Sequence, residues 1–373
     1  MRALFLVFHG FSPSNGISKK ISYQVDALNK CGLETELCYL KEEEKKYRMV
    51  GDNIIYEFGG GLLAKIIKRL EYKSIVEYIV SKNIKFVYVR YDHNASPITI
   101  LLFRAIKKLG VQLFLEIPTF PYDNEAGPCK YSYRIQRKLD LIYRNRLMQY
   151  VDKIVTFSNH TVIFGRPTIQ ISNGIDFNSI KLRVPTNNSS KSLNLIAVAQ
   201  IHYWHGFDRI IKGLAEYYKI DREFKVYLNI VGEMFGEEER RTIVPLIDQN
   251  NLWQYITLLG AQHGEDLNRS FDNADMAVGS LGRHRSNITY IKTLKNREYA
   301  ARGFSFVYSE VDDDFESKEY ILKVPADESS INIIDIVDFW TNQKMSPMEI
   351  RSSILELSWE SQFSKVVESI NIL

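Results

Sequence analysis

Six basic side chains gather around a single acidic one between Met276 and Ser309. The acidic residue is Glu298, and the basic residues are Arg283, Arg285, Lys292, Lys295, Arg297 and Arg302. A concentration of positive charge around one carboxylate favours the binding of an anionic group such as a phosphate. Whether these side chains can act together depends on the local structure that presents them.

The segment LKNREYAARG is predicted to form a helix directly after a basic loop. Thr293 stands in a good N-cap position, Leu294 is the first helical residue, and Gly303 is placed to end the helix. The preceding strand, DMAVGS, ends near Ser280. A helix that begins just past the carboxyl end of a strand offers free backbone amides and a favourable dipole to an anion.

Charged side chains extend this predicted anion site. Lys292 and Lys295 flank the helix start, and Glu298 lies about one turn further along, on the same side as Lys295. A phosphate bound at the helix start and two sugar hydroxyls bound by the Glu298 carboxylate would together correspond to a nucleotide diphosphate. The alternative is an ordinary surface helix in which Lys295 and Glu298 form an i,i+3 pair.

A second loop of this kind follows the first strand. The segment HGFSPSNGISKK is rich in Gly and Ser and opens a helix near Gly16, which would place a second anion site at a strand end. A plain strand-to-helix turn would have the same composition. The spacing G-x-G-x-x-G is missing, and the second strand ends in LCYLK without a ribose-binding acid, so a dehydrogenase is disfavoured.

Short apolar runs and amphipathic stretches alternate along the chain, which predicts parallel sheets covered by helices. The chain has 373 residues, more than the usual size of one core, so we expect an α/β protein of two doubly wound, Rossmann-like domains facing a central cleft. The expected boundaries are 1–170 for the N-terminal domain, 171–193 for a linker, 194–345 for the C-terminal domain and 346–373 for a crossover helix.

Charge and cysteine content narrow the possible partners. Residues 1–165 carry 25 Lys and Arg against 16 Asp and Glu, a net charge of +9, whereas residues 166–373 carry 23 against 29, a net charge of −6. The basic residues are spread over amphipathic helices without a recognition motif, so nucleic acid is not expected as a partner. Cys31, Cys38 and Cys129 form no CxxC pair, which favours reduced thiols in the cytoplasm.

The chain resembles the retaining glycosyltransferases of the GT-B fold, within glycosyltransferase family four, and among them bacterial enzymes of capsule and surface polysaccharide assembly. The resemblance covers nearly the whole chain. It rests on NGIS at 15–18, LEIPTFPYDNE at 115–125, ISNGID at 171–176, WHGFDRIIKGL at 204–214, LKNREYAARG at 294–303 and LSWESQFSKVV near the end. It implies a C-terminal helix that returns toward the N-terminal domain.

The resemblance also implies roles for individual residues. Glu298 matches the second glutamate of a Glu-x7-Glu pair, the ribose ligand, but Tyr290 stands where the first glutamate, a donor-sugar ligand, is expected. Gln200 and His205 occupy the places of an Arg and a Lys that usually bind the diphosphate, so Lys292 and Lys295 are interpreted as replacement countercharges. The expected donor-binding residues are Gly16, His205, Arg283, Lys292, Thr293, Leu294, Lys295 and Glu298.

Residues of the first domain are expected to reach the reacting groups and the acceptor. Arg90 and His93, in VRYDHNASP after a strand, are the candidate catalytic residues, and the alternative for His93 is a loop histidine with a local hydrogen bond. Glu116, Tyr122 and Glu125 are expected to form a rigid acceptor-side wall. The acidic run at 312–314 is interpreted as a solvated turn, and no metal ligands are expected.

The expected activity is metal-independent transfer of a sugar with retention, without a cofactor, from a nucleotide-diphosphate sugar. A UDP sugar is the expected donor, although the sequence itself does not identify the base. The expected acceptor is a saccharide or a saccharide linked to a lipid diphosphate. We expect a cytoplasmic protein. Basic segments of the first domain, such as KIIKRLEYK at 65–73, have two interpretations: they attract anionic lipid and make the protein peripheral on the inner membrane face, or their lysines only solvate the helices. The alternatives are a nucleotide-sugar epimerase on the same fold and a catalytically silent nucleotide-sugar-binding protein.

Overall fold

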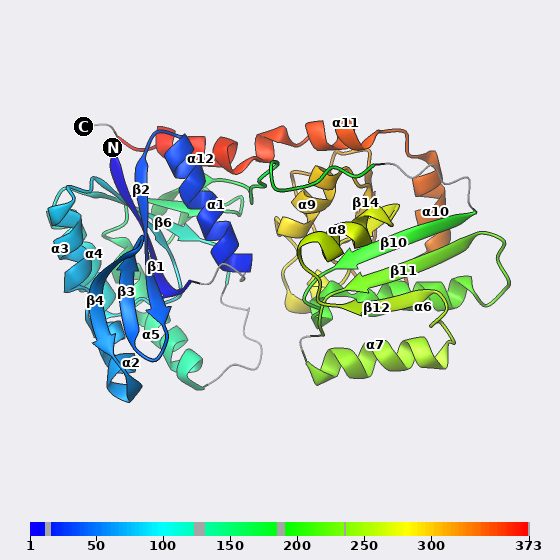
Figure 1. Ribbon diagram of the computed structural model, residues 1–373, viewed down its shortest axis with the longest axis horizontal. Coiled ribbons are helices and arrows are strands. Elements are labelled where there is room, and N and C mark those ends of the chain that lie inside the picture. Colours follow the sequence, from blue (N-terminus) through cyan, green and yellow to red (C-terminus); the bar gives the residue numbers. More distant parts are fainter. Residues whose placement is uncertain (12–15, 123–130, 185–190, 235, 372–373) are drawn as a thin grey trace. The chain divides into compact units, whose positions relative to one another are not determined.

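The computed structural model divides into two compact units, each built around its own sheet (Figure 1). Unit 1 comprises Met1–Ser172 and Trp359–Leu373, and unit 2 comprises Asn173–Ser358. The structure describes residues 1–11, 16–122, 131–184, 191–234 and 236–371. The expected α/β architecture of two Rossmann-like units is confirmed.

Within its described residues, unit 1 contains a nine-stranded sheet in the order β4-β3-β2-β1-β5-β6-β7-β9-β8. Its core from β2 to β9 is parallel, and its edge strands pair antiparallel. The strands are β1 (Arg2–Gly10), β2 (Glu34–Glu42), β3 (Lys46–Val50), β4 (Asn53–Gly59), β5 (Phe86–Arg90), β6 (Gln112–Ile117), β7 (Lys153–Thr156), β8 (Val162–Ile163) and β9 (Arg166–Gln170). The helices are α1 (Gly16–Lys30), α2 (Gly61–Leu70), α3 (Lys73–Ser81), α4 (Pro97–Lys108), α5 (Tyr131–Met148) and α12 (Trp359–Glu368).

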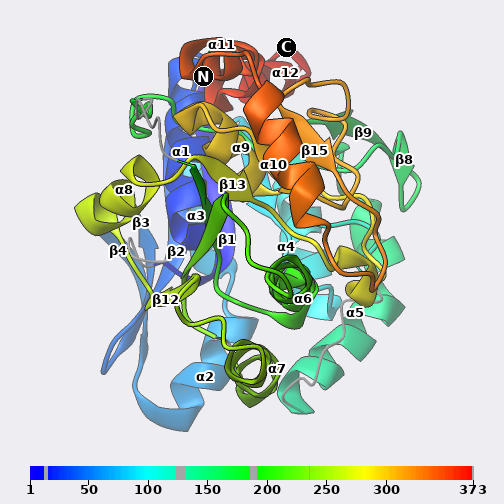
Figure 2. The same ribbon diagram turned by 90° about the vertical axis from the view of Figure 1, so that its right-hand side faces the viewer.

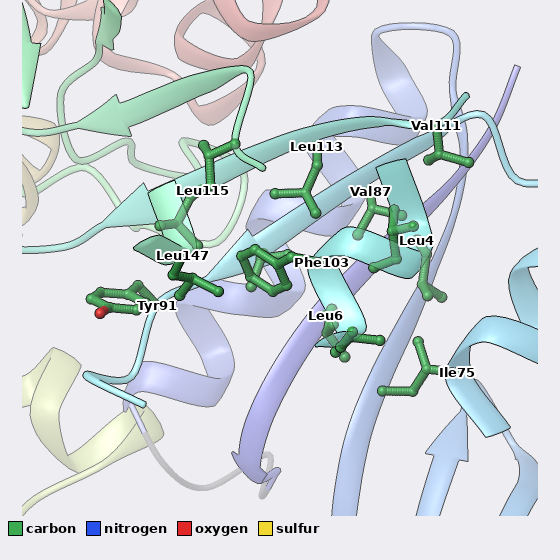
Figure 3. Close-up of a cluster of buried hydrophobic side chains, with 14 of the residues drawn as sticks. Leu4, Leu6, Ile75, Val87, Tyr91, Phe103, Val111, Leu113, Leu115 and Leu147 are labelled. Atoms are coloured by element: carbon green, nitrogen blue, oxygen red, sulfur yellow. The ribbon is translucent and has the colours of Figure 1, made fainter. Parts of the chain in front are cut away.

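Successive side chains of the central strands of unit 1 pack on opposite faces of the sheet, as an extended backbone requires. One face carries Leu4, Leu6, Val87, Leu113 and Leu115 against α3 and α4 (Figure 3). The other face carries Ala3, Phe5, Phe86, Tyr88 and Phe114 against α1 and α12. Both faces are apolar, which explains why these strands appear in the sequence as continuous hydrophobic runs.

In the described part of unit 2, six parallel strands follow the order β12-β11-β10-β13-β14-β15. The strands are β10 (Ser192–Val198), β11 (Lys225–Val231), β12 (Ile256–Gly260), β13 (Met276–Val278), β14 (Phe306–Tyr308) and β15 (Ile321–Lys323). The α-helices are α6 (Phe207–Tyr217), α7 (Glu237–Gln249), α8 (Gly264–Asp272), α9 (Leu294–Arg302), α10 (Ile333–Asn342) and α11 (Pro347–Ser352), and the 3₁₀ helices are η1 (Tyr203–His205), η2 (Arg283–Ser286) and η3 (Leu355–Leu357).

The sheet of unit 2 also separates two apolar layers. Leu195, Val278 and Val307 pack with α6, α7 and α10, whereas Ile196, Ala277 and Phe306 pack with α8, α9 and α11. Within unit 2, α6 lies beside α7 (Figure 2). The helices on the two faces hold the strand ends, and therefore the loops that follow them, in fixed positions.

Two local elements differ from the sequence prediction. The pattern LLAKIIKRLEYKSIVEYIVSKN predicts one helix, but the structure contains two: Glu71 is the C-cap of α2, and Tyr72 is the N-cap of α3. The Glu71 carboxylate accepts hydrogen bonds from the backbone nitrogen of Ser74 at 2.9 Å and from its hydroxyl at 2.8 Å, as an N-terminal capping group does. The segment between the second predicted strand and this helix pattern is predicted to be a variable loop, but its residues 46–59 form the antiparallel strands β3 and β4 at the sheet edge.

The chain crosses between the units at Ser172 and again at Ser358. Unit 2 therefore begins inside the range expected for the linker and extends past residue 345: Arg183, for example, donates its backbone N–H to the carbonyl oxygen of Arg302 at 2.9 Å. The last helix, α12, belongs to unit 1, where Trp359 and Phe363 pack into the same core as α1. In the described ranges, no helix has the length and apolar character needed to cross a bilayer.

Candidate functional site

The candidate site lies in unit 2, at the carboxyl ends of β10, β13 and β14. From β10 the chain adds β11 and β12 on one side, and then crosses to add β13 and β14 on the other side. Ligands of doubly wound sheets bind at the carboxyl ends of the strands, at the point where the strand order reverses in this way. The segments at this point are η1, residues 280–286, the start of α9 and Glu310.

Two of these segments approach each other at backbone distance, which requires glycine. Gly206 has a φ angle of 64°, and a Cβ atom added there would lie 2.6 Å from the backbone nitrogen of Gly282. The backbone nitrogen of Leu281 donates to the carbonyl oxygen of His205 at 2.9 Å. The loop after β10 is thereby fixed against the loop after β13, which brings His205 close to basic side chains.

His205 is buried and neutral. Its Nδ1 accepts a hydrogen bond from the backbone nitrogen of His202 at 3.0 Å, so the ring proton resides on Nε2. Burial, followed by the charges of Lys295 and Arg283, lowers the pKa of His205 well below its usual value. At the position where the resemblance implies a lysine, the protein therefore offers a neutral hydrogen-bond donor rather than a cation.

Lys295 is the central residue of the site. It lies in the first turn of α9, and its amine nitrogen is enclosed although part of its stem reaches the surface. This amine has no hydrogen-bond partner among the residues that the structure describes. Burial, together with the nearby charge of Arg283, lowers the pKa of Lys295 to about 7, while Glu310 acts in the opposite direction. A buried amine without a partner is unfavourable for folding, and a bound anion would supply the missing hydrogen bond.

Other enclosed polar atoms around Lys295 also lack partners within the described ranges. They are the hydroxyl oxygens of Ser280 and Thr293, the side-chain oxygen of Asn296 and both carboxylate oxygens of Glu310. Thr293 occupies the N-cap position of α9 as predicted, but its hydroxyl does not cap the helix. Native interiors leave few polar atoms unpaired, and so many at one strand edge indicate a place where a polar ligand binds. We call Ser280, Thr293, Lys295, Asn296 and Glu310 the strand-end cluster.

Three further predicted donor-binding residues lie around this cluster. The Arg283 guanidinium lies 5.4 Å from the ring centre of Trp204, and its charge affects the pKa values of His205, Lys295 and Glu310. Leu294 is 40% exposed and, because its side chain is apolar, can offer only its backbone amide to an anion. Glu298 accepts hydrogen bonds at 2.9 and 3.0 Å from Arg302, which is four residues further along α9. The alternative i,i+3 pair between Lys295 and Glu298 is not formed in the described structure.

Lys292 differs from Lys295, because it belongs to an internal ion-pair network. Its amine lies 3.7 Å from Asp314, and the buried Arg297 pairs with both Asp312 and Asp314. The acidic run at 312–314 is therefore not the solvated turn that we expected, since Asp312 is fully buried. This run neutralises two basic residues of the helix start, which leaves Lys295 as the more available countercharge.

Tyr290 is directed to the same acidic run. Its hydroxyl donates to Asp313 at 2.5 Å, and its backbone forms an isolated parallel bridge with Val311. No group of three His, Cys, Asp or Glu side chains suited to a metal ion occurs in the described part of the chain.

The candidate residues of unit 1 lie at the carboxyl ends of β1, β5 and β6. Gly16 begins α1, with open space around the position of a Cβ atom. Arg90 pairs with Glu116, and Glu116 also accepts hydrogen bonds at 2.7 Å from Gln24 and at 2.7 Å from Tyr88. Glu116 is fully buried, so the structure places it inside the core rather than on an acceptor-side wall. The charges of Arg90 and Lys20 explain how a carboxylate is tolerated there.

His93 and Tyr122 lie together. The His93 ring is 4.2 Å from the ring of Tyr122, and the hydroxyl of Tyr122 donates to Asp140 at 3.2 Å. Tyr122 is buried and packs against the His93 ring, so its side chain serves the interior of unit 1 rather than the surface of the expected acceptor-side wall. His93 has a φ angle of 48°, a strained backbone conformation of a kind that often occurs at functional sites. Glu125 lies outside the described residues.

The sequence interpretation did not single out Ser280, Asn296 or Glu310. A signal for Glu310 exists in the sequence, because this carboxylate follows the buried strand FSFVYS directly and so must stand at the carboxyl edge of the sheet. Its enclosure beside Lys295 follows from the tertiary packing of α9 against β14, which no local pattern reveals.

Comparison with solved structures shows that the fold of the whole chain is that of GT-B proteins. Sucrose-phosphate synthase from Thermosynechococcus elongatus has a TM-score of 0.65 and 16% sequence identity, over 98% of this chain and 96% of that chain. HepE from Anabaena, solved in complex with UDP, has a TM-score of 0.63 and 14% identity, over 99% of this chain and 100% of its own. UDP-GlcNAc 2-epimerase from Methanocaldococcus jannaschii has a TM-score of 0.50 and 11% identity, over 99% of both chains. No family model matches the chain, and no curated protein matches it in sequence.

Proposed function

We propose that this protein is a glycosyltransferase that moves a sugar from a nucleotide-diphosphate donor to a saccharide acceptor. The observation that carries the proposal is the enclosed, unpartnered amine of Lys295 at the strand-order reversal of unit 2. An anion held there would receive a charge-assisted hydrogen bond in a poorly solvated place, where such bonds are strongest. The solved complex of HepE with UDP supports UDP as the nucleotide of the donor.

The strand-end cluster is suited to the departing diphosphate. Lys295 in its protonated form, the first backbone amides of α9 and the Nε2–H of His205 would stabilise the negative charge that develops on the leaving phosphate. Because these groups supply positive charge without a metal ion, we propose metal-independent transfer. Arg283 adds a further cation at the edge of the cluster.

Transfer with retention follows from the resemblance and remains part of the proposal. The acceptor hydroxyl would attack the anomeric carbon from the side of the leaving group, so that a new carbon–oxygen bond replaces the bond to phosphate. The departing phosphate would take the hydroxyl proton, and no protein base is required. Within unit 1, His93 is the candidate to contact the reacting groups, whereas Arg90 is engaged by Glu116.

A panel of nucleotide sugars tests the proposal. UDP, GDP, ADP and CMP sugars are compared by thermal shift, and the sugar that stabilises the protein is then incubated with saccharide acceptors. We expect stabilisation by a nucleoside-diphosphate sugar, followed by product in which the sugar has moved to an acceptor or to water. Formation of an epimer without transfer would instead support an epimerase, and binding without turnover would support a silent binding protein. No stabilisation by any member of the panel would refute the proposal.

The membrane part of the proposal rests on α2. Only Ala64 of this ten-residue helix is buried, whereas Leu62, Leu63, Ile66 and Leu70 are 56–78% exposed. The same helix carries Lys65, Lys68 and Arg69. Exposed apolar side chains interleaved with cations match the interface of an anionic bilayer, in which the leucines enter the acyl boundary and the cations meet the headgroups. We infer that unit 1 binds the cytoplasmic membrane surface, where a lipid-diphosphate-linked saccharide of surface or capsular polysaccharide would serve as acceptor.

A further inference from the structure

Glu310 is a buried carboxylate with no evident structural partner. It follows β14, the residue is 1% exposed, and apart from its own backbone amide no described residue donates a hydrogen bond to its carboxylate oxygens. Buried carboxylates are normally paired or hydrogen-bonded, as Glu116 and Asp312 are in this protein. The contrast with these two residues shows that Glu310 does not serve the core in the same way.

Its surroundings restrict what Glu310 could bind. Burial raises the pKa of Glu310 to about 7, while a hydrogen bond from its own backbone amide and the charges of Lys295 and Arg283 act in the opposite direction. No ion pair within 4.0 Å joins Glu310 to Lys295 in the described structure, so neither group satisfies the other directly. An anion would be attracted to Lys295 and repelled by Glu310. The part of a ligand next to Glu310 must therefore be neutral and must donate hydrogen bonds.

A nucleotide sugar has both kinds of group next to each other. Its diphosphate is anionic, and the sugar attached to the diphosphate carries hydroxyl groups that can donate to a carboxylate. The ribose is the other hydroxyl-bearing part, but Glu298 on α9 is the candidate for the ribose, and its carboxylate is directed toward α8 through Arg302 and Asn268. Glu310, on the loop after β14, is left for the transferred sugar.

The position of Tyr290 agrees with this assignment. The resemblance implies a carboxylate at position 290, but the Tyr290 side chain is directed to Asp313 instead. The backbone of Tyr290 pairs with Val311, the residue next to Glu310. A carboxylate from position 310 can therefore reach the same edge of the site from the neighbouring strand.

We propose that Glu310 recognises the donor sugar by accepting hydrogen bonds from its hydroxyl groups, while Lys295 binds the adjoining diphosphate. This inference rests on the proposed function and extends it, because it assigns the sugar and the phosphate to two neighbouring residues. It requires that the two residues contribute to different parts of the same ligand, which binding measurements can separate.

The test compares UDP with UDP-glucose by calorimetry on the wild-type protein and on E310Q. Glutamine keeps the size of the side chain but removes the charge and one acceptor, and an exposed glutamate of the same unit, Glu237, provides the control E237Q. We expect E310Q to lower the affinity for UDP-glucose by about tenfold or more, because charge-assisted hydrogen bonds to the sugar are lost. The affinity for UDP should stay unchanged. K295M should lower the affinity for both ligands, and E237Q should leave both affinities unchanged.

Two results would overturn the inference while leaving the proposed function intact. The first is an unchanged preference between UDP-glucose and UDP in E310Q. The second is an equal loss of affinity for UDP-glucose and for UDP in E310Q, which would mean that the carboxylate contacts the ribose or only positions Lys295. If the wild-type protein binds neither ligand nor any other member of the nucleotide-sugar panel, both the proposed function and the inference fail. Thermal unfolding of E310Q without ligand shows whether the variant is folded, and the thermal shift with UDP gives a second measure of its nucleotide site.

Discussion

Replacing Lys295 with methionine should weaken diphosphate binding and, at the same time, stabilise the ligand-free protein. Methionine fills a similar volume without a charge, so the enclosed amine and its missing partner both disappear. Loss of a charge-assisted hydrogen bond corresponds to about 1.5–3 kcal/mol, which is at least tenfold in the affinity for UDP. Uridine, which has no phosphate, should bind equally well to both proteins.

The effect on stability follows from the pKa of Lys295. Burial lowers this pKa from 10.5 to about 7, and each pH unit between the two values corresponds to about 1.36 kcal/mol. Because the folded-state pKa lies below the unfolded one, the unfolded chain binds more protons across this window. The free energy of unfolding of the wild-type protein should therefore rise as the pH increases from about 7 toward 10.5. The contribution is at most about 5 kcal/mol, and the coupled charge of Glu310 reduces it.

Urea unfolding at pH 7 and pH 9 measures this contribution. The free energy of unfolding of the wild-type protein should increase from pH 7 to pH 9, and that of K295M should increase less. The control K344M changes an exposed lysine of unit 2 and should behave as the wild type. Calorimetry at pH 8, in buffers of different ionisation enthalpy, should also show proton uptake when UDP binds, since the neutral amine must be protonated to meet the phosphate. The groups around this amine are Glu310, Arg283 and the neutral His205. Wild-type UDP affinity in K295M, with no proton uptake in either protein, would refute the reasoning.

Three further outcomes are expected. E298A should lower the affinity for uridine and for UDP to a similar extent, by about tenfold, because the carboxylate is assigned to the ribose. Unchanged calorimetric affinity for both would mean that α9 is an ordinary surface helix without a role in nucleotide binding. Sugar transfer should continue in EDTA, because Lys295 and the amides of α9 provide the positive charge, and an absolute need for Mn²⁺ or Mg²⁺ would contradict this mechanism. The protein should co-sediment with vesicles containing anionic lipid at low salt, at about 1 kcal/mol per well-placed cation, but not with neutral vesicles. The double variant L62S and I66S on α2 should abolish that binding, whereas the control L355S, at an exposed leucine of unit 2, should not. If the wild-type protein does not bind anionic vesicles, the proposed membrane binding is wrong.

The sequence predicts the alternation of strands and helices well, because strands buried on both faces appear as continuous apolar runs such as ALFLVF. It also predicts the helix that begins after Thr293 and ends at Gly303, since the capping residues are local signals. It fails at Glu71, where a side-chain cap interrupts a pattern that is otherwise continuous over two helices.

The site is less predictable, because its properties arise from residues far apart in the chain. Glu116 has the appearance of a surface carboxylate beside prolines, but Gln24, Tyr88 and Arg90 enclose it. Lys292 and Lys295 are indistinguishable in the sequence, yet the acidic run at 312–314 neutralises one and leaves the other. Only the packed structure distinguishes a charge held by the protein from a charge left for a ligand.

The way that α12 completes unit 1 has a consequence for how the chain folds during synthesis. The first 172 residues emerge early, but the face formed by Phe5, Tyr88 and α1 stays uncovered until Trp359 and Phe363 have been made. Unit 2, by contrast, is continuous in sequence and can close its core before synthesis ends. The first part of the chain to be translated is therefore the last to reach its native state, and a chain that stalls in unit 2 carries an exposed aromatic surface on which aggregation can start.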